Sequence, residues 1–71
     1  MYQIFGHNRS KDSFIEYGTY GKYCEAMNRL DELAQYLESW QLRTTDGNLI
    51  NWLSVYKVNE SGEELVAAIY R

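Results

Sequence analysis

The feature that most constrains the fold is one stripe of apolar residues at helical spacing, set between segments with strand-like patterns. The stripe recurs at steps of three and four residues and comprises Tyr23, Ala26, Met27, Leu30, Leu33, Ala34 and Leu37. This spacing is typical of a single buried helix face. On both sides of it the pattern changes to runs rich in aromatic and β-branched residues, which favour strands. The pattern therefore predicts a small α+β domain.

The flanking segments each predict two strands. The expected elements are strands at about residues 1–5, 13–19, 49–58 and 63–70, with a helix over about 22–39. Thr19 or Gly21 is the expected N-cap of the helix. Residues 40–48 leave two alternatives open: Trp40 continues the helical stripe, whereas 41–44 would suit a short edge strand before a turn at Asp46-Gly47.

The expected architecture is a single domain over residues 1–71 with the element order β-β-α-β-β. It is a four-stranded, mainly antiparallel sheet with one helix packed on one face. A chain of 71 residues is near the lower limit for a self-sufficient core. Because Cys24 is the only cysteine and His7 the only histidine, neither an internal disulfide nor a structural zinc site is expected. Stability must come from packing.

The net charge of −3 argues against a phosphate-backbone binder, which usually carries a basic footprint. It leaves proteins with basic surfaces as partners. No apolar run has transmembrane length, and the first residues lack the pattern of a signal peptide. Together with the lone thiol, these features predict a cytoplasmic protein without a membrane partner.

No constellation of residues predicts catalysis or a cofactor. Cys24 and His7 are the only pair that could supply a nucleophile and a base, but they lie in different elements without supporting spacing. His7 falls in a predicted polar turn over residues 6–12, where a surface histidine is expected. Adjacent acids such as Glu63 and Glu64 diverge on a strand and predict only solvated charge. We therefore expect no enzyme, no metal site and no cofactor.

Two surfaces are candidates for binding. The third and fourth predicted strands are apolar on both sides, and one helix covers only one face of a sheet. The other face is then covered by loops around Trp40 and Leu42, tolerated as exposed, or used for self-association or a partner. The residues predicted for that surface are Tyr17, Trp52, Tyr56 and Tyr70. The second surface is the acidic outer face of the helix, formed by Glu25, Asp31, Glu32 and Glu38.

The sequence therefore predicts a small acidic, non-catalytic protein-binding module. Compact acidic single-domain chains without motifs are common among phage-encoded inhibitors of host defence, including anti-CRISPR proteins, and this analogy of size and composition makes such an inhibitor one specific hypothesis. One alternative is an accessory or regulatory subunit that dimerises or docks through an aromatic sheet face. Another is a small enzyme or ligand-binding protein, which requires a pocket with perturbed titratable groups.

Overall fold

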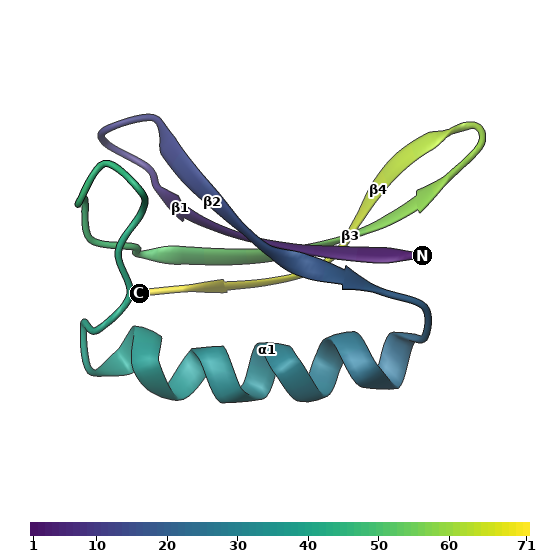
Figure 1. Ribbon diagram of the computed structural model, residues 1–71, viewed down its shortest axis with the longest axis horizontal. Helices are drawn as coiled ribbons and strands as arrows, with labels where there is room; N and C mark the ends of the chain where they lie inside the picture. The colour runs from purple at the N-terminus through teal and green to yellow at the C-terminus, as the bar shows by residue number, and fades with distance from the viewer.

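The computed structural model describes residues 1–71 and confirms the predicted α+β class and element order. A single antiparallel sheet has the strand order β2-β1-β3-β4, and one helix lies across one of its faces (Figure 1). The elements are β1 (Tyr2–Asn8), β2 (Ser13–Tyr20), α1 (Tyr23–Glu38), β3 (Trp52–Asn59) and β4 (Gly62–Tyr70). No helix of the protein is both long and apolar enough to cross a membrane.

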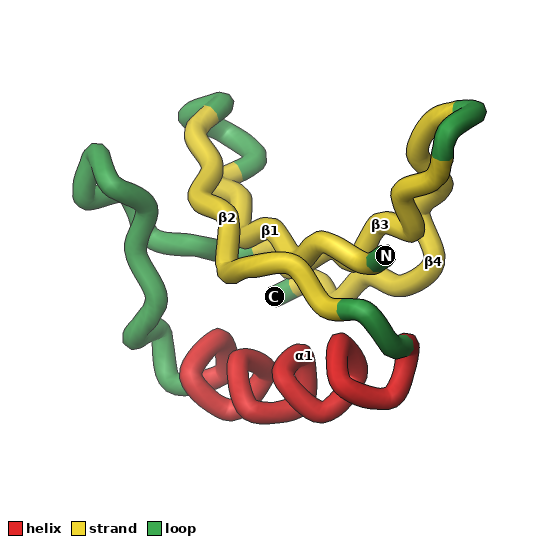
Figure 2. The backbone as a smooth tube through the Cα atoms, turned by 45° about the vertical axis from the view of Figure 1, so that its right-hand side comes forward, coloured by secondary structure: helices red, strands yellow, loops and turns green.

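The sheet consists of two hairpins joined by their first strands. β1 pairs with β2 and β3 pairs with β4, while the antiparallel pairing of β1 with β3 brings distant parts of the chain together. Both hairpin tips bend away from α1, at opposite ends of the sheet (Figures 1 and 2). The sheet and α1 therefore form two layers, and one face of the sheet has no layer above it.

The core lies between α1 and the sheet. The helix contributes four buried residues of the predicted stripe: Ala26, Leu30, Leu33 and Leu37. The sheet side contributes Ile4 from β1, Leu53 and Val55 from β3, and Ile50 just before β3. Tyr23 opens the stripe but remains half exposed, packing its ring edge-on against Tyr2 at a centroid distance of 5.6 Å.

The ends of α1 differ from the sequence predictions. The N-cap is Lys22, which makes no side-chain capping hydrogen bond, so the expected caps Thr19 and Gly21 are wrong. At the other end, Gln41 N–H donates to Tyr36 O at 3.0 Å and Trp40 N–H donates to Leu37 O at 3.2 Å. This pair of bonds is a Schellman motif, with Trp40 in the left-handed conformation at φ 58°. The helix therefore stops before Trp40.

The segment between α1 and β3 follows neither predicted alternative in full. It forms one isolated antiparallel bridge, between Arg43 and Leu49, instead of a strand over residues 41–44. A turn closes it, in which Gly47 N–H donates to Thr44 O at 2.9 Å. Trp40 does not fold over the open sheet face; its ring remains 44% exposed, with the Arg71 guanidinium 4.8 Å from its centroid.

The first strand is longer than predicted. β1 continues through Gly6 and His7 to Asn8, whereas the sequence pattern suggested a turn after Phe5. Gly6 is buried inside this strand, and a Cβ atom added there would lie 2.7 Å from Tyr17 Cε2 and 2.8 Å from Ile50 Cδ1. The glycine is therefore required for close packing on the helix side, not for a turn.

Candidate functional site

A row of aromatic rings crosses the uncovered face of the sheet, with one ring from each strand. Phe14 of β2 pairs with His7 of β1, His7 pairs with Trp52 of β3, and Trp52 pairs with Tyr70 of β4. The successive ring centroids lie 6.2, 4.2 and 5.5 Å apart, and the last two contacts are stacked. Such distances are those of interacting aromatic pairs. The row is thus a continuous surface of rings.

Two further rings extend this surface along the strands. Phe5 lies 5.9 Å from Tyr56 and 6.1 Å from Phe14, both in edge-on geometry. None of the six rings belongs to the side chains packed on the core. We call this set the aromatic face; it comprises Phe5, His7, Phe14, Trp52, Tyr56 and Tyr70.

Strand alternation explains why the rings gather on one side. Successive side chains of a strand point to opposite faces of the sheet. In β1, Ile4 is buried beneath α1 and Gly6 faces the same side. Phe5 and His7 alternate with them, so both rings lie on the uncovered face. In β3, Leu53 and Val55 face the helix, which leaves Trp52 and Tyr56 on the uncovered face.

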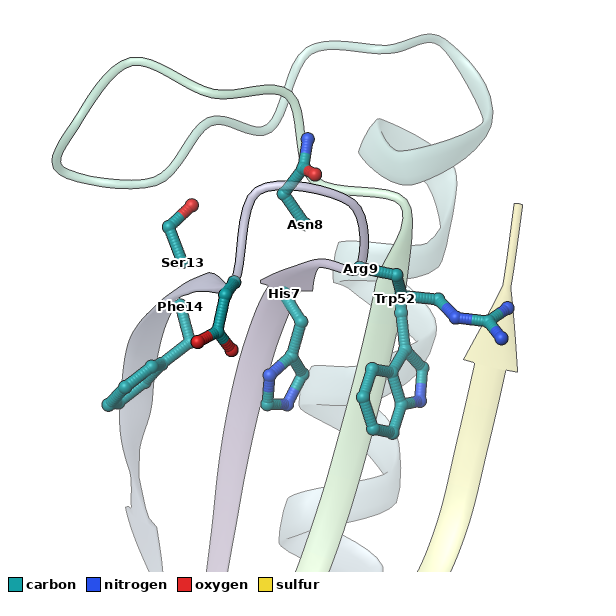
Figure 3. Close-up of a pocket in the computed structure, with 7 residues that line it drawn as sticks. His7, Asn8, Arg9, Ser13, Phe14 and Trp52 are labelled. Carbon is teal, nitrogen blue, oxygen red and sulfur yellow. The ribbon is translucent and has the colours of Figure 1, made fainter.

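A cavity of about 230 Å³ opens on this face beside the β1–β2 hairpin (Figure 3). Figure 3 shows the side chains of Phe14, His7 and Trp52 projecting from adjacent strands along it. Arg9 lies at the same end, with its guanidinium carbon 5.1 Å from the centroid of the Tyr70 ring. The lining residues are His7, Asn8, Arg9, Asp12, Ser13, Phe14 and Trp52.

His7 is held in place at the centre of the row. Its Nε2 shares a hydrogen bond of 2.9 Å with Ser54 Oγ, and its ring stacks on Trp52. Burial lowers the pKa of His7 below its ordinary value, because the charged imidazolium is poorly solvated there. The predicted turn at His7 is wrong, because His7 lies in β1, and its side chain is half-buried on the uncovered face. Ser54 is fully buried, so this hydroxyl orients the imidazole and is not accessible to a substrate.

One polar group on this face lacks a partner. The Nε1–H of Trp52 is buried and makes no hydrogen bond. A buried donor left unsatisfied costs about 1–3 kcal/mol. The aromatic face thus contains a buried hydrogen-bond donor without an acceptor. The buried side chains of the core beneath α1 are almost all aliphatic and have no such group.

The predicted sheet-face set is brought together only in part. Trp52, Tyr56 and Tyr70 lie on the aromatic face. Tyr17 was assigned to the same surface, and this is wrong: it packs against the core from the helix side, close to Gly6. Its burial there raises the pKa of its hydroxyl, and the charge of Arg29 acts in the opposite direction.

The sequence reasoning missed four members of the site: Phe5, His7, Phe14 and Arg9. The alternation of Phe5 with Ile4 and of Phe14 with Ile15 contains the signal within the predicted strands, whereas His7 joins it only if β1 is continued beyond Phe5. Phe14 is 61% exposed, slightly more than Tyr70 at the opposite end of the row. It therefore marks the outer limit of the aromatic face on β2.

The acidic residues of α1 form a separate surface. Glu25, Asp31, Glu32 and Glu38 are all exposed. Arg29 Nη1 lies 3.0 Å from Glu32 Oε2, and this hydrogen bond is the main cause of a raised pKa at Arg29. Because α1 and the aromatic face lie on opposite sides of the sheet, the two predicted surfaces do not form one site.

The arrangement offers ring faces and a few polar groups, without a cluster of metal ligands. No three His, Cys, Asp or Glu side chains come together anywhere in residues 1–71. Cys24 is exposed near the start of α1, away from His7. Comparisons with protein-family models, curated proteins and solved structures give no match, so the function is argued from the site itself.

Proposed function

We propose that this protein is a non-catalytic protein-binding module that receives a basic segment of a partner on the aromatic face. The observation that carries this proposal is the continuous row of rings across all four strands on the face that α1 leaves uncovered. Large exposed apolar patches mark interaction surfaces, and Trp and Tyr are frequent anchors of interfaces.

The basic character of the partner follows from the electrostatics of this face. The chain carries a net charge of −3. Glu16 lies opposite Phe5 and Glu63 lies opposite Val58, which places both carboxylates on the same side as the rings. The negative π-faces of aromatic rings attract guanidinium groups. Arg9 over Tyr70 is an internal example of that contact, which the partner's arginines would repeat on the neighbouring rings.

Two observations support a binding role over catalysis. The hydroxyl that hydrogen-bonds His7 belongs to the fully buried Ser54, so it is shielded from any substrate. The exposed thiol of Cys24 lies on a different element from the imidazole. The groups of the aromatic face are therefore suited to contact, not to proton or acyl transfer.

The test uses a probe of defined chemistry. A short peptide that alternates arginine and leucine is titrated into the ¹⁵N-labelled protein, and a peptide with glutamate in place of arginine serves as the control. We expect saturable shifts confined to the strands that carry the rings, for the basic peptide only. Equal shifts with both peptides, or shifts confined to α1, would overturn the proposal.

A matched pair of variants assigns the surface. Phe14→Ser removes an exposed ring from the aromatic face, and Tyr36→Ser removes a ring of similar exposure from α1, at 61% and 49% respectively. We expect Phe14→Ser to weaken peptide binding at least about tenfold, as for a hot-spot residue. Tyr36→Ser should bind like the unaltered protein. The reverse result would place the contact on the helix.

The acidic surface of α1 is the second candidate for the contact. Charge reversal at Asp31 and Glu32 to lysine leaves the aromatic face intact and is expected to weaken binding less than Phe14→Ser. If the basic peptide instead loses affinity mainly in this double variant, and more so at low salt, then α1 is the binding surface. Unchanged binding in all three variants would remove both surfaces from consideration.

The narrower proposal is an inhibitor of a host defence protein encoded by a phage, and it rests on the analogy of size and charge alone. Its test is capture from host lysate with the tagged protein and with Phe14→Ser. A single stoichiometric nuclease effector captured by the former and lost by the latter would support it. Capture of a partner encoded in the same genome would favour the accessory-subunit alternative, and the inhibitor proposal would then be dropped.

A further inference from the structure

β4 lies at one edge of the sheet and has an unpaired backbone along its outer side. Its nine residues are Gly62–Tyr70, with β3 as their only neighbour. The strand contains neither proline nor lysine, two residues that commonly block pairing at exposed edges. Its last six residues, Leu65–Tyr70, are apolar. An edge of this kind can pair with another strand.

The hydrogen bonds to β3 identify the backbone groups that point outward near the end of β4. Arg71 N–H donates to Asn51 O at 2.8 Å, so Arg71 faces β3. In an antiparallel ladder, residues facing the neighbour alternate with residues facing away. Ile69, opposite Leu53, therefore also faces β3. It follows that the N–H and C=O groups of Ala68 and Tyr70 point away from the sheet.

The same reasoning applies at the start of β4. Asn59 and Gly62 close a two-residue hairpin loop, so Gly62 faces β3. Glu63 and Leu65 then point outward. The register shifts between Val55 and Tyr56, where Val66 is the extra residue of a bulge. The bulge changes the alternation, so the outward residues are Glu63, Leu65, Ala68 and Tyr70.

We propose that a second copy of this chain pairs antiparallel with β4. In the proposed register, Tyr70 lies opposite the partner's Glu63, and Ala68 lies opposite the partner's Leu65. Each outward N–H and C=O group of these four residues then has a hydrogen-bonding partner in the other copy. The same register places the two-fold axis between Val66 and Ala67, so the bulges of both copies meet at the centre. The edge is therefore complementary to itself, as an isologous interface requires.

Side chains and charges agree with this register. Tyr70 lies opposite Trp52 and Glu63 opposite Val58, both on the uncovered face, so residues paired across the axis share a face. Antiparallel pairing also sets Arg71 of one copy diagonal to Glu64 of the other. A parallel arrangement would instead bring the acids of the two copies together. The dimer would have one eight-stranded sheet, in which the aromatic row of each copy ends at Tyr70 beside the partner's Glu63.

The experiment combines mass with residue-level protection. Sedimentation equilibrium of the intact chain from micromolar to millimolar concentration is expected to change from monomer to dimer. Amide hydrogen exchange at the two extremes should show protection gained with concentration at Glu63, Leu65, Ala68 and Tyr70. A monomer at all concentrations would overturn the proposal. So would protection gained along β2 instead, or a series of open oligomers, which β2–β4 pairing would generate.

A proline variant separates pairing from folding. Ala68→Pro removes an outward N–H and no hydrogen bond to β3, and proline is tolerated at strand edges. We expect a folded monomer with an unchanged circular dichroism spectrum and at least a tenfold weaker self-association. A folded variant that dimerises like the parent would contradict the proposal. If the variant fails to fold, the exchange measurement on the unaltered chain still decides the matter.

Discussion

The two faces of the sheet come from the same four strands and differ in what they bury. Under α1 the fully buried residues are aliphatic, as at Ile4, Leu53 and Val55, and the rings there, such as Tyr17, pack only at the margin of the core. On the other face the residues are rings that stay partly exposed, from Trp52 to Phe14. Aliphatic chains fill space tightly, whereas rings keep an apolar body with a polar edge or tip. The covered face therefore stabilises the fold, whereas the residues of the uncovered face remain available to a partner.

The largest expected effect tests the covered face. Leu53→Ala removes a fully buried side chain and leaves a cavity, so the free energy of unfolding should fall by about 2–5 kcal/mol. Phe14→Ala on the opposite face should cost about 1 kcal/mol, because its ring is 61% exposed and makes edge-on or tilted contacts with the rings of Phe5 and His7. Urea unfolding of both variants measures the difference. Equal losses would mean that the aromatic face is a second core.

A smaller effect concerns overpacking on the covered side. Gly6→Ala places a Cβ atom within 3 Å of Tyr17 and Ile50, and these side chains must move. We expect a loss of about 1–3 kcal/mol in the free energy of unfolding, as for other overpacked sites. Gly21→Ala is the control, since nothing lies within 4 Å of its added Cβ. Comparable losses in the two variants would contradict the close packing at Gly6.

Trp52→Phe tests how much a ring of the uncovered face contributes to the free energy of unfolding. The substitution keeps a ring in the stack between His7 and Tyr70 and removes the unpartnered Nε1–H. The lost apolar contact and the relief of an unsatisfied donor oppose each other, so unfolding free energy should change by less than about 1 kcal/mol. Differential scanning calorimetry is the measurement. A loss of several kcal/mol would show that Trp52 supports the fold as Leu53 does.

The smallest effect is a pH dependence centred on His7. Its pKa in the folded protein lies below the ordinary 6.5, so above that pH the imidazole is neutral in both states and contributes no pH dependence. As the pH falls through 6.5 the unfolded chain binds the proton first, and stability is lost until the folded pKa is passed. Melting curves between about pH 8 and about pH 5 measure this loss. His7→Gln should show a smaller decrease; an identical decrease would assign the effect to other groups.

Sequence patterns predict the fold more completely than the candidate site. The helical stripe from Ala26 to Leu37 and the two hairpins are local signals, and local periodicity determines both. The site depends on which side of the sheet each ring occupies. That depends on how far each strand continues, as at Gly6, which packs against Tyr17 and Ile50 from other parts of the chain, and on bulges such as the one in β4.

Particular residues show where this limit lies. Ending the first strand at Phe5 hid the alternation that places Phe5 and His7 on one face. Tyr17 has the composition of an interface residue, but it packs on the core beside Gly6. Trp40 continues the stripe of α1 in spacing, yet it adopts a left-handed conformation that ends the helix. In each case a tertiary contact or a backbone geometry overrides a correct local pattern.

The pairing of β1 with β3 has a consequence for folding kinetics. Each hairpin closes a short loop, but the pairs from Tyr2↔Lys57 to His7↔Trp52 close a much longer stretch of chain, which is slower to form. The stack of Trp52 on His7 exists only once that closure is made. In a Trp40→Phe variant, in which Trp52 is the only tryptophan, fluorescence in stopped-flow refolding should therefore follow the non-local step itself. The complete aromatic face therefore forms only when the whole sheet has formed, because each hairpin supplies only part of its rings.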